Sequence, residues 1–139
     1  MTPEGKASIL VKLQLNRNNC RVFRNNSGVA YDQSNRPVFF GLGNDGKKDK
    51  ESIRTPDHVG WHVVTVTPDM VGKKLAVFTA VDAKKAGFTR KTTYPVGTRE
   101  YGQKKFFDLV IESGGVAGFA SCEQDVNDLI TDFYMRFKP

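Results

Sequence analysis

Apolar residues recur at helical spacing in three stretches of the chain. In residues 3–17 they fall mostly three or four positions apart, with Thr2 suited to the N-cap and Pro3 to the first helical position. Residues 101–112 form a second such stretch, which a Ser-Gly-Gly sequence closes. The third follows a capping-box pattern at residues 121–124 and carries one apolar face, made of Val126, Leu129, Ile130, Phe133, Tyr134 and Phe137. The sequence therefore predicts three helices.

Five shorter stretches have the composition of β-strands. Residues 20–24 alternate between polar and apolar, residues 36–40 follow a turn sequence, and residues 61–66 are rich in β-branched side chains. Residues 75–81 form an apolar run of the kind found in a central strand covered on both faces, and residues 116–120 give a fifth strand. The order of these elements predicts an α/β fold in which helices flank one mixed β-sheet.

Length and composition indicate one folded domain over residues 1–139. The 139 residues are 39% hydrophobic and 11% aromatic, which is enough to bury a core. No apolar stretch approaches the roughly 20 residues that a membrane-spanning helix needs, and the first residues lack the apolar run of a signal peptide. We therefore expect a soluble cytoplasmic protein without a membrane partner, in which Cys20 and Cys122 are reduced thiols.

Positive charge is concentrated in the middle of the sequence. The whole chain has a formal net charge of +6, whereas residues 73–105 alone contain nine Lys or Arg and two acidic residues, a net +7. Aromatic residues are interleaved with these cations, a mixture that can contact phosphates by charge and bases by stacking. A solvated basic loop is the alternative. As candidates for DNA contact this segment offers Lys85, Arg90, Lys91, Arg99 and Lys104.

Two familiar binding motifs are present only in part. Residues 41–46 spell the glycine fingerprint of dinucleotide-binding proteins, but the polar residues that follow have no apolar face for the helix that this motif requires. The polar stretch 41–56 is therefore predicted to be a loop. His58 and His62 are four residues apart but lack the intervening Glu of a zinc protease helix, so we expect structural or solvent-facing histidines.

One group of polar residues suggests catalysis. Asp82, Ala83 and Lys84 end the predicted central strand, where alternation sends the Asp82 and Lys84 side chains to the same face. Asp57 begins a neighbouring predicted strand. Two carboxylates and the Ala83 carbonyl would form a hard oxygen site for Mg²⁺ or Mn²⁺, and a lysine beside it could orient or deprotonate water and offset negative charge. The alternative is an Asp82–Lys84 pair that only caps the strand.

These residues resemble the signature of PD-(D/E)xK nucleases, with Pro56 and Asp57 followed by Asp82, Ala83 and Lys84. The surrounding sequence is similar to the virus-type replication-repair nuclease (VRR-NUC) domain in its small stand-alone phage form. The similarity runs from about Glu4 to the last helix, and the matching segments are residues 22–28, 41–43, 57–61, 76–84, 103 and 114–118. It implies a restriction-endonuclease-like core and, for a phage-encoded protein, the host cytoplasm.

The resemblance also implies roles for individual residues. Asp57, Asp82 and the Ala83 carbonyl would be metal ligands, and Lys84 would be the catalytic lysine. Glu4 matches an acidic residue that binds metal through water, and Gln103 matches a glutamine near the active site. The family usually has Glu where Asp82 stands, which leaves rate and substrate preference open. A loop that would touch DNA corresponds to Arg24, Asn25 and Asn26.

The expected function is a divalent-metal-dependent, structure-specific DNA endonuclease that hydrolyses phosphodiester bonds of branched or duplex DNA. Small members of the family resemble Holliday-junction resolvases, and cutting two equivalent strands of a four-way junction suits a homodimer with two sites. Two alternatives remain at this point. One is a non-catalytic DNA-binding protein with a nuclease-like fold, and the other is a flap or single-strand nuclease.

Overall fold

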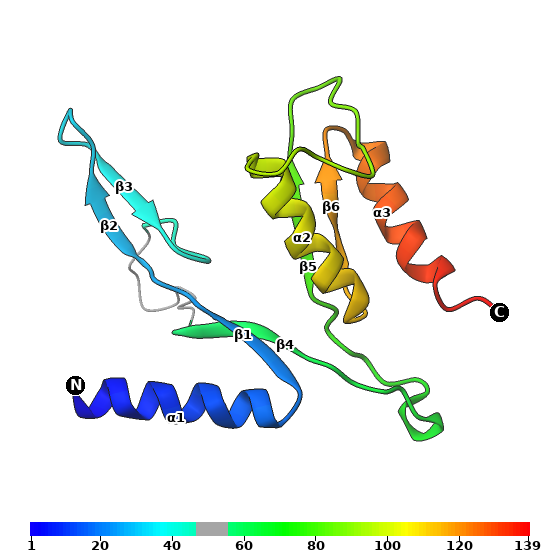
Figure 1. Ribbon diagram of the computed structural model, residues 1–139, viewed down its shortest axis with the longest axis horizontal. Helices are drawn as coiled ribbons and strands as arrows, with labels where there is room; N and C mark the ends of the chain where they lie inside the picture. Colours follow the sequence, from blue (N-terminus) through cyan, green and yellow to red (C-terminus); the bar gives the residue numbers. More distant parts are fainter. Residues whose placement is uncertain (47–55) are drawn as a thin grey trace. The chain divides into compact units, whose positions relative to one another are not determined.

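The computed structural model describes residues 1–46 and 56–139, which form two compact units, Met1–Val64 and Thr65–Pro139 (Figure 1). Each unit is described by itself. Both contain helix and strand, so the predicted mixed α/β class is confirmed. The prediction that residues 1–139 form one domain stays a prediction, and most of the predicted 41–56 loop lies outside the described residues.

The first unit begins with helix α1 (Pro3–Arg17), at the position that the sequence predicts. The Thr2 hydroxyl accepts a hydrogen bond from the Gly5 backbone N–H at 3.0 Å, and Pro3 occupies the first turn, where a helix has no use for a backbone donor. Glu4 lies in the same turn and Arg17 in the last one, as the helix dipole favours.

The strands of the first unit pair in two antiparallel ribbons. Strand β1 (Cys20–Arg24) pairs with β4 (His58–His62), and β2 (Gly28–Tyr31) pairs with β3 (Pro37–Phe40). The turn between β2 and β3 is closed by Asp32, whose Oδ1 accepts from the backbone N–H groups of Ser34 and Arg36, each at 2.9 Å. The sequence did not predict β2, because four residues with a glycine give little strand signal.

The second unit contains a βαβ arrangement followed by a helix. Strand β5 (Thr79–Ala83) leads through a long connection to helix α2 (Arg99–Glu112), which returns the chain to β6 (Val116–Ala120). Strands β5 and β6 are parallel, and α3 (Glu123–Met135) follows. A short 3₁₀ helix, η1 (Pro68–Met70), precedes β5.

The core of the second unit is centred on β6. Val116, Ala117, Phe119 and Ala120 are at most 7% exposed, and α2 adds Phe107 and Val110. Helices α2 and α3 both pack on β6 (Figure 1). Small residues in β6 let α3 come close, since a side chain at Gly118 would lie 2.6 Å from Leu129.

The predicted central strand is therefore corrected. Residues 75–81 were expected to be covered on both faces, but strand β5 begins only at Thr79, and Val81 is 44% exposed. Strand β5 has the same length as its partner β6, which lies between Gly115 and Ser121. An apolar run shows that a strand is present, whereas the available ladder partner determines where it begins and ends.

Other element bounds also differ from the prediction. The strand expected at residues 61–66 is β4, which begins three residues earlier, and α2 begins two residues earlier than expected because Thr98 caps it. The predicted capping box at residues 121–124 is wrong. Asp125, and not Gln124, contacts Ser121 before the helix. Its Oδ2 accepts hydrogen bonds from the Ser121 backbone N–H at 2.8 Å and from the Ser121 hydroxyl at 3.0 Å.

The described strands pair two by two, in the sheets β1–β4, β2–β3 and β5–β6, instead of forming the one mixed sheet that the sequence predicts. Both kinds of pairing occur, antiparallel in the first unit and parallel in the second. Among the helices of residues 1–46 and 56–139, none combines the length and the apolar character that crossing a membrane requires.

Substitution of Phe119 tests how much the core of the second unit contributes to stability. Its ring is 4% exposed and contacts the rings of Phe88, Tyr94 and Phe107. We expect Phe119→Ala to lower the free energy of unfolding by about 3–5 kcal/mol, because a large ring leaves a cavity. Phe119→Leu should cost less in the same urea titration followed by circular dichroism. Equal stability of Phe119→Ala and wild type would contradict this account of the core.

Asp125 makes the start of α3 sensitive to acid. Hydrogen bonds from the Ser121 backbone and side chain lower the pKa of Asp125 below its ordinary value of 3.8. This stabilisation is present above pH 3.8 and is lost as the pH falls through the lowered pKa. Asp125→Ala should therefore melt a few degrees below wild type at pH 7, and the gap should close in strong acid. Asp132→Ala, an exposed carboxylate of the same helix, is the control and should show no such narrowing.

Candidate active site

The carboxyl end of β5 brings Asp82 and Lys84 together. Asp82 lies opposite Phe119 in the ladder, and Ala83 lies opposite Ala120. The backbone N–H of Lys84 donates to the Ala120 carbonyl at 2.9 Å, so the ladder extends one residue beyond the strand. Side chains two apart on extended backbone share a face. The Lys84 ammonium accordingly lies 3.1 Å from Asp82 Oδ2.

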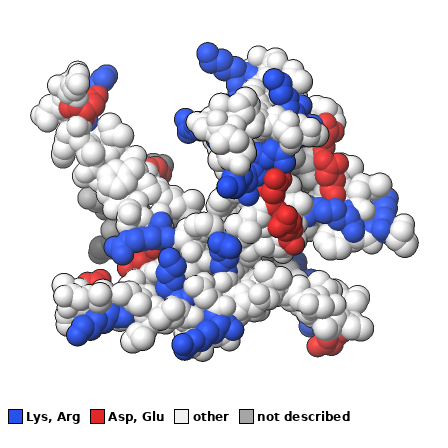
Figure 2. All heavy atoms as spheres, in the orientation of Figure 1, with Lys and Arg blue, Asp and Glu red and all other residues white. Residues whose placement is uncertain are grey.

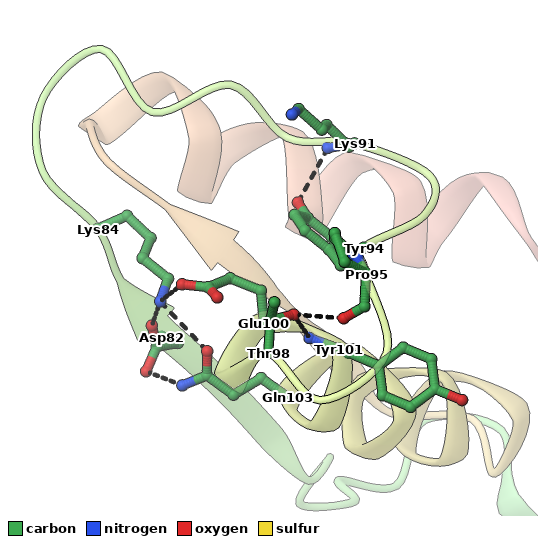
Figure 3. A network of polar contacts seen from close by, with 9 residues as sticks. All are labelled: Asp82, Lys84, Lys91, Tyr94, Pro95, Thr98, Glu100, Tyr101 and Gln103. Carbon is green, nitrogen blue, oxygen red and sulfur yellow. Dashed lines mark hydrogen bonds and ion pairs between the residues drawn. The ribbon is translucent and has the colours of Figure 1, made fainter.

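The first turns of α2 supply two further side chains. Thr98 fixes the start of this helix, since its hydroxyl accepts from the Tyr101 backbone N–H at 3.3 Å and donates to the Pro95 carbonyl at 2.7 Å. Glu100 and Gln103 are three residues apart and therefore neighbours on the helix surface. Both point toward Lys84 (Figure 3).

Lys84 lies at the centre of this network. Besides Asp82, its Nζ contacts Glu100 Oε1 at 3.3 Å and Gln103 Oε1 at 3.2 Å (Figure 3). The amide nitrogen of Gln103 donates to Asp82 Oδ1 at 2.7 Å, which closes a ring of contacts. The Lys84 side chain is only 15% exposed, and its Nζ lies 5.0 Å from the centroid of the Phe119 ring. Three oxygens and an aromatic face thus surround one cation.

The electrostatics follow from these contacts. The hydrogen bond to Asp82, supported by Glu100, raises the pKa of Lys84 above its ordinary value of 10.5, against the opposing effect of burial. The pKa of Glu100 is lowered, first by a hydrogen bond from its own backbone N–H at the helix start and then by Lys84. At neutral pH Lys84 is therefore an ammonium and Glu100 an ionised carboxylate.

The oxygens of this network are of the kind that Mg²⁺ and Mn²⁺ prefer. Asp82 and Glu100 offer carboxylates and Gln103 an amide carbonyl, all partly open to solvent, so that water could complete the coordination. These residues already gather around the Lys84 cation, and in this respect they fit a divalent metal. Among the residues that the structure describes, no group of three or more His, Cys, Asp or Glu is placed to hold a metal ion.

Asp57 and its surroundings belong to the first unit. The Asp57 carbonyl accepts from the Asn25 backbone N–H at 2.8 Å, and the Asn25 amide donates to the Pro56 carbonyl at 3.2 Å. Asn25 Oδ1 in turn accepts from the Leu42 backbone N–H at 3.0 Å. Asn25, predicted from the resemblance to touch DNA, thus fixes the backbone that carries Asp57.

The structure thus unites three of the predicted site residues, Asp82, Lys84 and Gln103, within the second unit. Glu4 lies exposed in the first turn of α1. The participation of Glu4 and Asp57, and of the Ala83 carbonyl, stays a prediction. In the predicted DNA-contact loop, the Arg24 guanidinium donates to Asn26 Oδ1 at 2.7 Å.

The predicted DNA-contact cations of the second unit divide into two groups. Arg90 lies 3.8 Å from Asp125 and 3.5 Å from Asp128, so it ties the connection after β5 to α3. Lys104 pairs with Asp108 one turn along α2 at 2.9 Å. Figure 2 shows several Lys and Arg side chains beside Asp and Glu side chains on the visible face. In the described part of the chain, no salt bridge involves the second group, Lys85, Lys91 and Arg99.

Sequence reasoning missed Glu100. Its position three residues before Gln103, on the face that Gln103 turns toward Asp82, was the signal that could have identified it. Sequence reasoning also missed a hollow beside the network, which is lined by Phe88 and Tyr94. From the sequence, these aromatic residues were interpreted only as part of a basic segment.

No protein-family model, curated protein or solved structure matches this chain.

Proposed function

We propose that the protein is a divalent-metal-dependent, structure-specific DNA endonuclease with a restriction-endonuclease-like core, similar to VRR-NUC domains. Its substrate would be branched DNA, with Holliday junctions first among the candidates, and two copies would act as a homodimer on two equivalent strands. The observation that carries the proposal is the convergence of Asp82, Lys84 and Gln103 at the end of β5. The sequence resemblance gives roles to the same three residues.

The chemistry follows from what each side chain can do. A bound Mg²⁺ or Mn²⁺, held by Asp82 and the Ala83 carbonyl, would supply a Lewis acid and a more acidic water. Asp57 as a further ligand stays a prediction of the resemblance. Lys84 can donate hydrogen bonds to a phosphate oxygen and offset the negative charge that grows during hydrolysis. Gln103 bridges Asp82 and Lys84 and so keeps their spacing. Glu100 holds the ammonium from the helix side.

The rival from a different class is a DNA-binding protein without catalysis. A lysine placed among carboxylates at a strand end could be a purely structural pair. The network argues for chemistry because two carboxylates and an amide surround a single cation that remains 15% exposed. A capped strand end needs only one of these partners. Cleavage of DNA in the presence of metal separates the two functions.

Charge removal at Asp82 provides the direct test. We expect Asp82→Asn to lower Mg²⁺-dependent cleavage of a labelled four-way junction by orders of magnitude, since a metal-binding charge is lost while the size of the side chain stays. Junction binding should hold or improve, because phosphate repulsion falls. Lys84→Ala should also abolish cleavage. Asp132→Asn, the same change at an exposed carboxylate of α3, is the control, and full activity of Asp82→Asn would refute the proposed site.

The salt dependence of DNA binding tests whether the cations without a salt bridge contact phosphate and the paired ones do not. If Lys85, Lys91 and Arg99 contact phosphates, changing all three to Gln should reduce the slope of log K against log salt by up to about 2.7 in magnitude. Lys104→Gln should leave the slope nearly unchanged, because Asp108 already neutralises Lys104. Titrations of fluorescent DNA at several salt concentrations measure both. An unchanged slope in the triple variant would mean that these cations are merely solvated.

A further inference from the structure

A hollow of about 400 Å³ opens between the connection after β5 and the first turn of α2. Its walls are mostly apolar and come from Phe88, Tyr94 and Pro95. The polar residues that also line it are Thr89, Lys91, Thr98 and Glu100. A volume of this size is typical of sites for small organic groups, in which apolar walls bury the ligand and a few polar groups orient it.

The aromatic walls are fixed by the core. The rings of Phe88 and Tyr94 lie with their centroids 5.3 and 5.5 Å from that of the buried Phe119. The Tyr94 hydroxyl also accepts a hydrogen bond from the Lys91 backbone N–H at 2.9 Å (Figure 3). The hollow is therefore formed before any ligand arrives, and a ligand would not have to order it.

The hollow is continuous with the Lys84 network. Glu100 lines it and also binds the Lys84 ammonium at 3.3 Å. Phe88 likewise faces both, since its ring centroid lies 5.8 Å from Lys84 Nζ. A ligand in the hollow would accordingly sit next to whatever anion Lys84 contacts.

From this arrangement we propose that the hollow receives one unpaired nucleobase of the DNA strand whose phosphate lies at Lys84, a proposal that rests on the proposed nuclease function. A nucleobase is flat, carries polar edges and stacks on aromatic rings, and it is joined to phosphates that suit the nearby lysines. A ligand without phosphate would make no use of that pairing of an aromatic hollow with adjacent cations.

The proposal predicts substrate preference. A base within a duplex would first have to leave the stack and its partner, whereas a base at a flap, a branch point or a single-stranded end is already accessible. The site should therefore favour DNA with an unpaired nucleotide over a fully paired duplex of the same length. This preference belongs to binding and does not require cleavage.

Fluorescent DNA without added metal tests this. The probes are a duplex with one unpaired 2-aminopurine and a fully paired duplex carrying the same base, both in EDTA. We expect wild type to bind the first at least about fivefold more tightly and to quench its fluorescence by stacking. Thr89→Phe, which places a large side chain at the lining of the hollow, should abolish the preference and the quenching. Thr92→Phe, an exposed threonine of the same connection, should leave both intact.

Tyr94→Leu serves as a second variant, because it keeps an apolar contact with Phe119 but removes an aromatic wall, and it should also lose the quenching. Equal affinity of wild type for the two duplexes, or quenching that Thr89→Phe retains, would overturn the hollow as a base site. A preserved preference without any Mg²⁺-dependent cleavage would refute the nuclease proposal and leave base binding standing. Mg²⁺-dependent cleavage without a preference for the unpaired base would refute base binding and leave the nuclease proposal standing.

Discussion

The parallel pairing of β5 with β6 is the constraint on which the second unit depends. Parallel neighbours cannot be joined by a tight turn, so the chain must cross from the end of one strand to the start of the next, here through α2. A crossover helix begins near the carboxyl end of the first strand and runs back. The start of α2, with Glu100 and Gln103, is therefore brought to the same edge at which Asp82 and Lys84 end β5.

Phe119 makes this edge part of the core. It lies opposite Asp82 in the ladder, is buried, and presents its ring to the Lys84 ammonium at 5.0 Å. The same ring supports Phe88 and Tyr94, which wall the hollow. Packing energy and site geometry thus depend on one side chain, so we expect a loss of core packing here to misplace Lys84 and the hollow together.

Much of the fold could be predicted because local signals were strong. Pro3 after Thr2 marked the start of α1, and residues 116–120 are β6 as expected. Strand bounds at residues 61–66 and 75–81 were wrong because an apolar run does not reveal which residues find a ladder partner. That Asp82 and Lys84 share a face could be predicted from their spacing, and Gln103 was added through the resemblance. The contact of Glu100 with Lys84 depends on how α2 is rotated, which only packing determines.

The net charge of +7 in residues 73–105 overstates the positive charge that the proposed DNA contact could use. Arg90 is held by Asp125 and Asp128, and Asp125 also caps α3 through Ser121, so one carboxylate links the helix start to the connection after β5. Phe88 and Tyr94 anchor the same connection on Phe119. A segment without regular secondary structure is thereby fixed by an ion pair and by ring contacts. Because these contacts use Arg90 for structure, the proposed phosphate contact would depend on cations that form no salt bridge in the described part of the chain, Lys85, Lys91 and Arg99. Of these, Lys91 also lines the hollow that would take the base.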